Sequence, residues 1–297
     1  MYIYIYIMII LDGQHVADKI QTSLIPRITS LKQKNVFPSL AVILANDSFE
    51  SRTYVSMKQK ICEKLGIQCK IHHCYQSNES ELISLIEDIN NSINIHGILI
   101  QLPLPSNINK NRILSTVSPI KDVDGLNPLN SGKLFQNNNI HFIPCTPRGC
   151  IDLIDYYQID IKGKHAVIVG SSNLVGLPLS ICLLYRGATV TICNINTINT
   201  KDHVQKADIV IACCGVPHLI KEDWIKEGSI IIDIGINRIE DKSNKKGYRV
   251  VGDVDFENVK HKVSHITPVP GGIGPMTITA LVRQVVEACE RNIMNKM

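Results

Sequence analysis

The sequence predicts an α/β protein built from two α/β domains around a cleft. Three observations lead to this fold class. The chain has 297 residues, which is enough for about two domains with sizeable cores. Hydrophobic residues make up 44% of it and charged residues 20%, values typical of a globular protein rather than a disordered or membrane one. Short apolar runs alternate with amphipathic stretches of helical length from end to end, which favours βαβ units and parallel sheets.

The apolar runs predict the strands, and the amphipathic stretches predict helices between them. Strands are expected at Ser39–Ala45, Gly97–Gln101, His165–Val169, Ala188–Cys193, Asp208–Ala212 and Ser229–Ile234. Helices are expected at Val16–Lys34, Phe49–Leu65 and Glu79–Ile93.

A seam between the domains is expected around Thr146–Gly163, where Pro144, Pro147 and Gly149 interrupt regular structure. The segment I-D-L-I-D-Y-Y predicts a connecting helix there. The C-terminal segment T-I-T-A-L-V-R-Q-V-V-E-A predicts a helix that packs back on the first domain. We therefore expect one domain from residues 1–146 plus 272–297 and a second from residues 147–271.

The chain opens with M-Y-I-Y-I-Y-I-M-I-I-L, an alternation that suits a strand. The run is too short to span a bilayer, which needs ~20 residues, and it lacks the features of a signal peptide. Residues 1–7 also fit a non-native extension ahead of a natural start at Met8. We expect no membrane association and no targeting role.

Charge and cysteine content narrow the partners and the compartment. A net charge of +4 is weak for this length, and the chain has no arginine-rich stripe, so nucleic acid is not an expected partner. The ten cysteines include no C-x-x-C pair and predict reduced thiols in a cytoplasmic protein. The histidines and cysteines lack metal-ligand spacing, so no metal site is expected.

Residues 267–277 read T-P-V-P-G-G-I-G-P-M-T and predict a loop that can form neither a helix interior nor a central strand. The loop leads into the C-terminal helix, with Pro275 in the first helical turn. Backbone amides in such a loop can approach a flat or anionic ligand closely. An ordinary turn before a helix is the alternative.

His165–Gly176 reads H-A-V-I-V-G-S-S-N-L-V-G and predicts a strand that turns through Gly170 into a helix. This is a relative of the dinucleotide-binding fingerprint, with serine at the second glycine. Gly170 allows the tight turn, Gly176 allows close packing of the helix, and the helix-start amides suit a pyrophosphate. A plain strand–turn–helix is the alternative reading.

The first domain carries candidate chemical groups. Ser51, Tyr54 and Lys58 share one helix face, where a ring and an amine can stack on a planar ligand and move a proton. Gln101 ends a strand and points beyond the sheet edge. Asp124 lies in the charged turn K-D-V-D-G. The alternatives are an amphipathic helix rim for Tyr54 and Lys58, capping of the strand end for Gln101, and an Asx-type turn for Asp124.

Eight segments occur together in one order, and together they resemble the bifunctional methylenetetrahydrofolate dehydrogenase/methenyltetrahydrofolate cyclohydrolase (FolD) family. They are Y-V-S-M-K, G-I-L-I-Q-L-P-L-P, K-D-V-D-G-L-N-P-L-N, P-C-T-P-R-G, V-G-S-S-N-L-V-G-L-P, D-I-G-I-N-R, G-D-V-D-F and T-P-V-P-G-G-I-G-P-M-T. The resemblance runs from about Ile10 to Ala288.

The resemblance implies roles for these residues. Lys58 matches the catalytic lysine, Tyr54 the pterin-stacking tyrosine, Gln101 the glutamine that contacts the lysine, and Asp124 the aspartate that anchors the pterin. Other matched or candidate positions are Ser51, Pro270, Gly271 and Gly272 for folate, and Gly170, Ser171, Ser172, Gly176, Asn194, Ile195 and Ile236 for the nicotinamide cofactor. The implied reactions are the oxidation of 5,10-methylenetetrahydrofolate and the hydrolysis of the product to 10-formyltetrahydrofolate. Members of the family are typically homodimers.

The resemblance favours NADP, although many relatives carry arginine where Ser171 stands and often histidine-serine where Asn194-Ile195 stand. An NAD site would favour an acidic residue after the strand Ala188–Cys193, and the run Cys193–Thr197 contains none. The sequence therefore carries neither the basic residues typical of an NADP site nor the acidic residue typical of an NAD site, and NAD stays possible. Alternative functions are a monofunctional NAD(P)-dependent dehydrogenase, a shikimate-type dehydrogenase and a non-catalytic nucleotide-sensing module.

Overall fold

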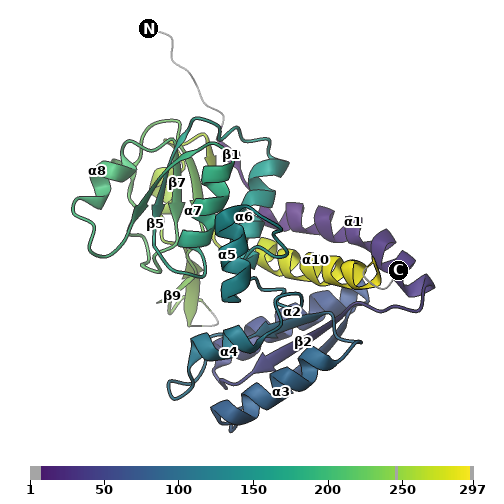
Figure 1. The fold of residues 1–297 in the computed structure, drawn as a ribbon. Coiled ribbons are helices and arrows are strands. Elements are labelled where there is room, and N and C mark those ends of the chain that lie inside the picture. Colours follow the sequence, from purple (N-terminus) through teal and green to yellow (C-terminus); the bar gives the residue numbers. More distant parts are fainter. Residues whose placement is uncertain (1–7, 245–246, 295–297) are drawn as a thin grey trace. The chain divides into compact units, whose positions relative to one another are not determined.

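The computed structural model describes residues 8–244 and 247–294 (Figure 1). These residues form two compact units. The six-stranded unit contains residues 8–17 and Thr146–Thr277, and the three-stranded unit contains Asp18–Cys145 and residues 278–294. Residues 8–17 and 272–277 cluster with the six-stranded unit, whereas the sequence-based division assigned them to the first domain. The second segment of the six-stranded unit begins at Thr146.

The six-stranded unit is built on a parallel sheet in the order β1-β11-β8-β7-β5-β6. Its strands are β1 (Ile9–Ile10), β5 (His165–Val169), β6 (Thr189–Cys193), β7 (Ile209–Ala212), β8 (Ile230–Asp233) and β11 (His265–Ile266). Its helical elements are α6 (Cys145–Tyr156), α7 (Gly176–Tyr185), α8 (Thr200–Val204), η1 (Glu222–Trp224) and α9 (Phe256–Val259). A separate antiparallel hairpin joins β9 (Asn237–Glu240) to β10 (Tyr248–Val251).

The three-stranded unit has a parallel sheet in the order β3-β2-β4, whose strands are β2 (Ser39–Leu44), β3 (Gln68–His73) and β4 (Gly97–Ile100). Its helices are α1 (Gly13–Gln33), α2 (Phe49–Leu65), α3 (Glu79–Asn91), α4 (Lys110–Thr116), α5 (Pro128–Gln136) and α10 (Ile273–Met294). The first residues of α1 and α10 belong to the other unit. Within this unit α1 and α10 lie side by side (Figure 1), joined by the Gln21–Thr279 and Arg27–Glu290 hydrogen bonds.

The alternation of side chains along β2 explains why both faces of this sheet are buried. Leu40, Val42 and Leu44 pack into the core that contains residues of α1, α2 and α10. Ala41 and Ile43 face the opposite core, which contains residues of α3 and α4. Neighbouring residues of a strand point to opposite faces, so a continuous apolar run requires a layer of helices on each side.

Local signals place the helix that carries the candidate lysine. α2 begins after Ser48, whose hydroxyl accepts a hydrogen bond from the Ser51 amide at 3.1 Å. It ends at Gly66, which adopts φ +72° and donates its amide to the last turn. These caps fix the register of the helix, so the positions of Tyr54 and Lys58 on one face follow from the sequence.

The structure confirms the α/β fold class and the six predicted strands within one residue at each end. It adds elements that the sequence did not predict: β3, β11, the hairpin, α4, α5, α8 and α9. The N-terminal alternation forms β1 only at Ile9–Ile10, and residues 1–7 lie outside the described residues. No helix in the described part of the chain combines the length and the apolar character needed to cross a membrane.

Candidate active site

Lys58 and Gln101 meet at the carboxyl end of β4. The Lys58 Nζ donates a hydrogen bond to the Gln101 Oε1 at 2.9 Å. Lys58 projects from the third turn of α2, and Gln101 is the residue that directly follows β4. The contact joins two residues that are 43 positions apart in the chain and brings the two predicted side chains together.

The backbone fixes the orientation of the Gln101 amide. Its Nε2 donates to the carbonyl of Leu102 at 2.7 Å, so the oxygen of the same amide faces the lysine. The Gln101 backbone amide is held by Ile43 of the neighbouring strand at 2.9 Å. Only 8% of the residue is exposed. Gln101 therefore presents a fixed, uncharged acceptor to the amine.

The three charged residues of the K-D-V-D-G turn have different partners. Lys121 donates to the carbonyls of Ile89, Asn90 and Ser92 at the end of α3. The Asp122 carboxylate accepts from the amides of Leu126 and Asn127, at 3.1 and 2.8 Å, and makes the Asx-type turn considered for Asp124. The carboxylate of Asp124 is thereby left to act on Lys58.

Electrostatics link Asp124 to Lys58. Burial lowers the pKa of the Lys58 amine from its ordinary value of 10.5, and the negative charge of Asp124 opposes this shift. Burial likewise raises the pKa of Asp124 above 3.8, opposed by Lys58 and by a hydrogen bond from Cys145. The pKa values of both groups are thus shifted toward neutral pH, which suits proton transfer.

Cys145 and Gln284 complete the surroundings of Asp124, and the sequence did not single them out. The Cys145 Sγ donates to the Val123 carbonyl at 3.3 Å, and burial raises the pKa of this thiol well above 9.0. Gln284 of α10 donates to the same carbonyl at 2.7 Å and accepts from the Ile143 amide at 3.1 Å. Only the P-C-T-P motif carried a sequence signal for Cys145, and no signal marked Gln284.

The other two residues of the α2 face differ in exposure. Tyr54 lies one turn before Lys58 and is 37% exposed, so its ring is accessible for stacking. Ser51 is buried at the helix start, and its hydroxyl accepts from the Ser48 hydroxyl at 2.9 Å. The structure therefore ties Ser51 to the Ser48 cap of α2, and its contact with a ligand stays a prediction.

In the six-stranded unit, the turn after β5 has the shape expected for a dinucleotide-binding turn. Gly170 adopts φ +128°, and a Cβ there would lie 2.3 Å from the Cys213 carbonyl oxygen. A Cβ at Gly176 would lie 1.9 Å from the Gly170 carbonyl oxygen. Ser171 and Ser172 lie between these glycines, and the Ser172 hydroxyl accepts from the Val175 amide at 3.2 Å. Gly170 is thus required by its positive φ and by the approach of Cys213, and Gly176 by the packing of the start of α7 on this turn.

The segment after β6 forms a compact polar turn. The Asn194 Oδ1 accepts from the Asn196 amide at 2.9 Å, and the Thr197 hydroxyl accepts from the Asn194 amide at 2.8 Å. Ile195 is 99% exposed at the tip of this turn. The turn presents hydroxyl and amide groups beside an apolar side chain, without a charged group of its own.

The Pro/Gly loop is anchored within the six-stranded unit. Gly271 adopts φ +107°, and its carbonyl accepts from the Gln14 amide at 3.1 Å. A Cβ at Gly272 would lie 2.6 Å from the Pro268 carbonyl oxygen, so this glycine is required. Pro270 is exposed. The loop leads into α10, which begins at Ile273 with Pro275 in its first turn, as predicted.

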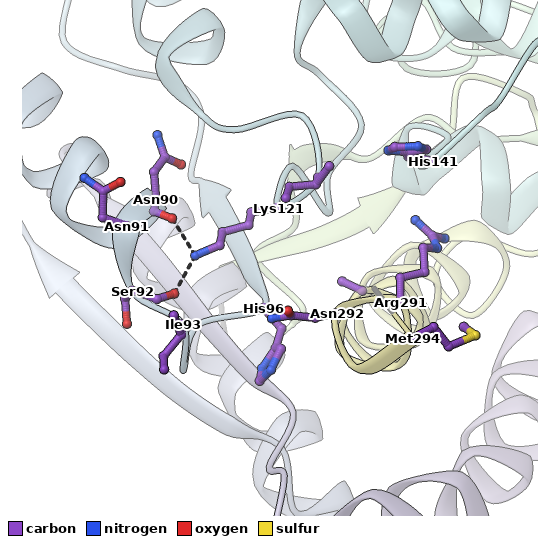
Figure 2. Close-up of a pocket in the computed structure, with 12 residues that line it drawn as sticks. Asn90, Asn91, Ser92, Ile93, His96, Lys121, His141, Arg291, Asn292 and Met294 are labelled. Carbon is purple, nitrogen blue, oxygen red and sulfur yellow. Dashed lines mark hydrogen bonds between the residues drawn. The ribbon is translucent and has the colours of Figure 1, made fainter. Parts of the chain in front are cut away.

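A cavity of about 420 Å³ in the three-stranded unit lies apart from these groups (Figure 2). Figure 2 shows His96, His141 and Arg291 around it, and Lys121 reaching the carbonyls of Asn90 and Ser92. His96 directly precedes β4, whereas Gln101 follows it, so the cavity lies at the opposite end of that strand. None of the predicted site residues lines it.

Comparisons with known proteins cover both units. Residues 11–124 match the catalytic domain of the tetrahydrofolate dehydrogenase/cyclohydrolase family, and residues 144–293 match its NAD(P)-binding domain. The bifunctional protein FolD of Nautilia profundicola is 49% identical over 95% of this chain and 98% of its own length. That of Aquifex aeolicus is 46% identical over 95% and 96%.

Solved structures show the same relationship. The bifunctional enzyme FolD from Campylobacter jejuni has a TM-score of 0.92 and 44% identity, covering 96% of this chain and 99% of that one. The Trypanosoma brucei enzyme, complexed with NADP and an inhibitor, has a TM-score of 0.92 and 33% identity, covering 96% and 98%. The ordered motifs, the fold and these full-length matches agree, and the chain belongs to the tetrahydrofolate dehydrogenase/cyclohydrolase family.

Proposed function

We propose that this protein oxidises 5,10-methylenetetrahydrofolate to 5,10-methenyltetrahydrofolate with NADP⁺ and hydrolyses the product to 10-formyltetrahydrofolate. The observation that carries the proposal is the buried Lys58 amine, held by Gln101 at 2.9 Å and within the field of Asp124. The full-length similarity to bifunctional relatives supports the same pair of activities.

The dehydrogenase step requires orientation more than acid–base chemistry. Tyr54 is accessible to stack on the pterin ring, and the Asp124 carboxyl can accept hydrogen bonds from it. The glycine turn at Gly170 and Gly176 fits a dinucleotide, because it leaves open the space that a Cβ would fill. When bound, NADP⁺ supplies the hydride acceptor.

The cyclohydrolase step requires proton transfer. Water adds to the methenyl carbon, the bond from that carbon to N5 breaks, and N5 gains a hydrogen, with one proton released overall. The lowered pKa of Lys58 increases the fraction of neutral amine that can take a proton from the attacking water. Gln101 holds the amine without adding charge. Lys58, Gln101, Tyr54 and Asp124 are therefore the proposed catalytic residues.

We further propose that NADP is preferred over NAD. The related Trypanosoma brucei structure was solved with NADP, and the turn Asn194–Thr197 carries no carboxylate that would repel a 2′-phosphate. Ser171, Ser172, Asn194, Ile195 and Ile236 are the proposed cofactor contacts.

We assign folate binding to residues 1–146 plus 272–297 and cofactor binding to residues 147–271. The family's catalytic domain matches residues 11–124, which supports the first assignment, and α10 contributes to the same core as β2. Pro270, Gly271 and Gly272 are proposed to line the folate side of the site. We also propose a homodimer, which light scattering of the purified protein would test. The ten free thiols fit a cytoplasmic location.

Absorbance assays of the purified protein test the function directly. Methylenetetrahydrofolate with each nicotinamide cofactor reports the dehydrogenase, and loss of methenyltetrahydrofolate absorbance reports the cyclohydrolase. We expect both activities. Oxidation without ring opening would establish a monofunctional dehydrogenase, and cofactor binding with neither activity would establish a nucleotide-sensing module.

A further inference from the structure

The Asp253 carboxylate joins two chain segments that lie at the carboxyl ends of strands in the six-stranded sheet. Its Oδ2 accepts hydrogen bonds from the backbone amides of Cys214 and Gly215, at 2.7 and 2.9 Å. Its Oδ1 accepts from the Asn237 Nδ2 at 2.8 Å. Asp253 is fully buried, with 0% exposure. A buried carboxylate with three donors is a strong constraint on the groups that it joins.

Both segments follow the carboxyl ends of neighbouring strands. Cys214 and Gly215 follow β7, and Asn237 lies beyond the end of β8, which pairs with β7 in parallel. Ligands of open parallel sheets bind at this edge, next to the strand pair where the order reverses. In the order β8-β7-β5-β6 the reversal lies between β5 and β7.

The glycine turn after β5 lies at this reversal. A dinucleotide bound there would extend to both sides of it, with one half on each side. A pyrophosphate bound at the turn and at the start of α7 would place the adenosine toward β6. The nicotinamide half would then lie toward the ends of β7 and β8, near the two segments that Asp253 joins.

Asp233, the last residue of β8, holds Asp253 in place. Its Oδ1 accepts from the amides of Gly235 and Asp253, at 2.9 and 3.1 Å. A Cβ at Gly235 would lie 2.3 Å from the Asp253 Oδ1, and one at Gly252 would lie 1.8 Å from the Asp233 Oδ2. The two carboxylates and two glycines thus form one closely packed unit.

Ile236 lies between the two anchors. The amide of the preceding Gly235 is bound by Asp233, and the side chain of the following Asn237 is bound by Asp253. Ile236 itself is 49% exposed. Its neighbours on both sides are held by hydrogen bonds, which restrains the backbone that carries this apolar side chain.

We infer that Asp253 is a positioning residue for the nicotinamide half of the cofactor site. It acts through Cys214, Gly215 and Asn237 and does not touch the cofactor. This inference rests on the proposed dehydrogenase function. It assigns the motif G-D-V-D a role in hydride-transfer geometry, separate from cofactor affinity.

The substitution Asp253→Asn tests the inference. An asparagine oxygen can still accept from Cys214 and Gly215, but these bonds lose the charge of the carboxylate, and the Asn237 amide must turn over to keep its bond to position 253. Displacement of reacting groups by about 1 Å costs on the order of 10²-fold in rate. We expect dehydrogenase kcat to fall at least tenfold, about the effect of losing one charged hydrogen bond. The Kd for 2′-phospho-ADP-ribose, which lacks nicotinamide, should stay within about threefold of wild type, since the adenosine half is untouched.

The reciprocal variant Asp253→Asn/Asn237→Asp provides the rescue. The new carboxylate at position 237 accepts from the new amide at position 253, so the bridge is restored with donor and acceptor exchanged. We expect most of the lost kcat to return. Asp208→Asn is the matched control, because Asp208 bridges the His165 amide and Lys226 at the opposite edge of the same sheet. It should leave kcat unchanged.

The outcomes separate the inference from the proposed function. A wild-type protein without dehydrogenase activity would refute the function. Unchanged kcat in Asp253→Asn, equal loss of fragment binding, or failure of the swap to restore kcat would each overturn the positioning role. If Asp253→Asn does not fold, Asn237→Ala decides the question: it keeps both backbone bonds and should still lower kcat several-fold.

Discussion

At the scale of single residues, the proposed chemistry depends on one amine, Lys58, in an environment that disfavours its charge. Burial lowers the pKa of Lys58, while Asp124 limits the shift. Gln101 supplies an acceptor without adding a negative charge that would raise this pKa again. A glutamate at position 101 would favour the ammonium form and reduce the fraction of general base.

The first prediction is that Lys58→Met abolishes ring opening while folate and cofactor still bind. Loss of a general acid–base group costs ~10²–10⁴-fold in rate. In the wild type, the cyclohydrolase rate should rise with pH through an inflection below 10.5, because the pKa of Lys58 is lowered. Lys60→Met is the control, since Lys60 is exposed on the same helix. An unchanged rate of methenyltetrahydrofolate hydrolysis in Lys58→Met would defeat the assignment.

Asp124→Ala should impair both activities together, because its carboxyl is proposed to anchor the shared substrate. A hydrogen bond to a charged group contributes ~1.5–3 kcal/mol, so folate affinity should fall by at least about tenfold. Affinity is measured by fluorescence titration with a folate analogue. Asp88→Ala, at an exposed position on α3, serves as the control. Normal affinity in Asp124→Ala would mean that Asp124 is only a turn residue.

At the scale of secondary-structure elements, strands with long apolar runs were predictable and edge elements were not. S-L-A-V-I-L predicted β2 because both of its faces are buried. The strand β3, Q-C-K-I-H-H, was missed because its polar residues break the apolar pattern. Among the described residues it lies at the edge of its sheet, beside β2, where polar side chains are tolerated. The two-residue strands β1 and β11 are defined by their pairing, which no local pattern encodes.

The site was predictable in the same uneven way. Spacing on α2 placed Tyr54 and Lys58 on one helix face, because helix periodicity is local, whereas their proposed roles came from the family resemblance. The division of labour in K-D-V-D-G depends on partners from α3 and from residues 126–130, so the sequence did not assign the turn to Asp122. Gln284 reaches Asp124's neighbour from α10, 161 residues away, a contact that no motif records.

Gly176→Ala should disrupt the turn that precedes α7. The new Cβ would lie 1.9 Å from the Gly170 carbonyl oxygen, so the helix start must shift. We expect at least tenfold weaker cofactor binding by calorimetry, because the amides proposed to bind the pyrophosphate move with the helix. Gly132→Ala is the matched control in α5: its Cβ meets no atom of the described residues within 4 Å, and helix propensity favours alanine by up to ~1 kcal/mol. Unchanged cofactor affinity in Gly176→Ala would contradict the assigned turn.

Asp233 should make the six-stranded unit less stable as pH rises. Burial raises the pKa of Asp233 to about 7 from 3.8. The folded state therefore keeps a proton that the unfolded chain releases, and stability is full below about pH 4 and declines as pH rises through about 7. The free energy of opening, measured by hydrogen exchange of the β8 amides, should fall between pH 4 and 8. Asp233→Asn should flatten this slope, and the exposed Asp160→Asn should not. A slope that persists in Asp233→Asn would contradict this origin.

At the scale of the whole molecule, the residues proposed for proton transfer and those proposed for cofactor binding belong to different units. Lys58, Gln101 and Asp124 all belong to the three-stranded unit, and the glycine turn and the Asp233–Asp253 carboxylates belong to the six-stranded unit. Proton transfer and cofactor binding can therefore be altered separately. Substitutions at Lys58 should spare cofactor binding, and substitutions at Gly176 should spare ring opening of methenyltetrahydrofolate.

The proposed cofactor preference depends on positions that carry no basic side chain. No arginine or lysine stands at Ser171 or in Asn194–Thr197, so a 2′-phosphate is met by hydroxyls and amides. The Asn194 and Thr197 oxygens already accept within their own turn, which leaves their remaining donors for the phosphate. Neutral hydrogen bonds are about half as strong as charge-assisted ones, so the preference for NADP should be modest.

We expect kcat/KM to be higher with NADP than with NAD at fixed methylenetetrahydrofolate, by less than about tenfold, the effect of a single weak charged contact. Ser171→Arg should widen this ratio by about tenfold or more, because a guanidinium forms charge-assisted bonds with a phosphate. Ser172→Arg is the comparison, since the Ser172 hydroxyl accepts from the Val175 amide within the glycine turn. Arginine at position 172 should weaken binding of both cofactors without changing their ratio. A wild-type preference for NAD of tenfold or more, or an unchanged ratio in Ser171→Arg, would overturn the proposed mode of 2′-phosphate recognition.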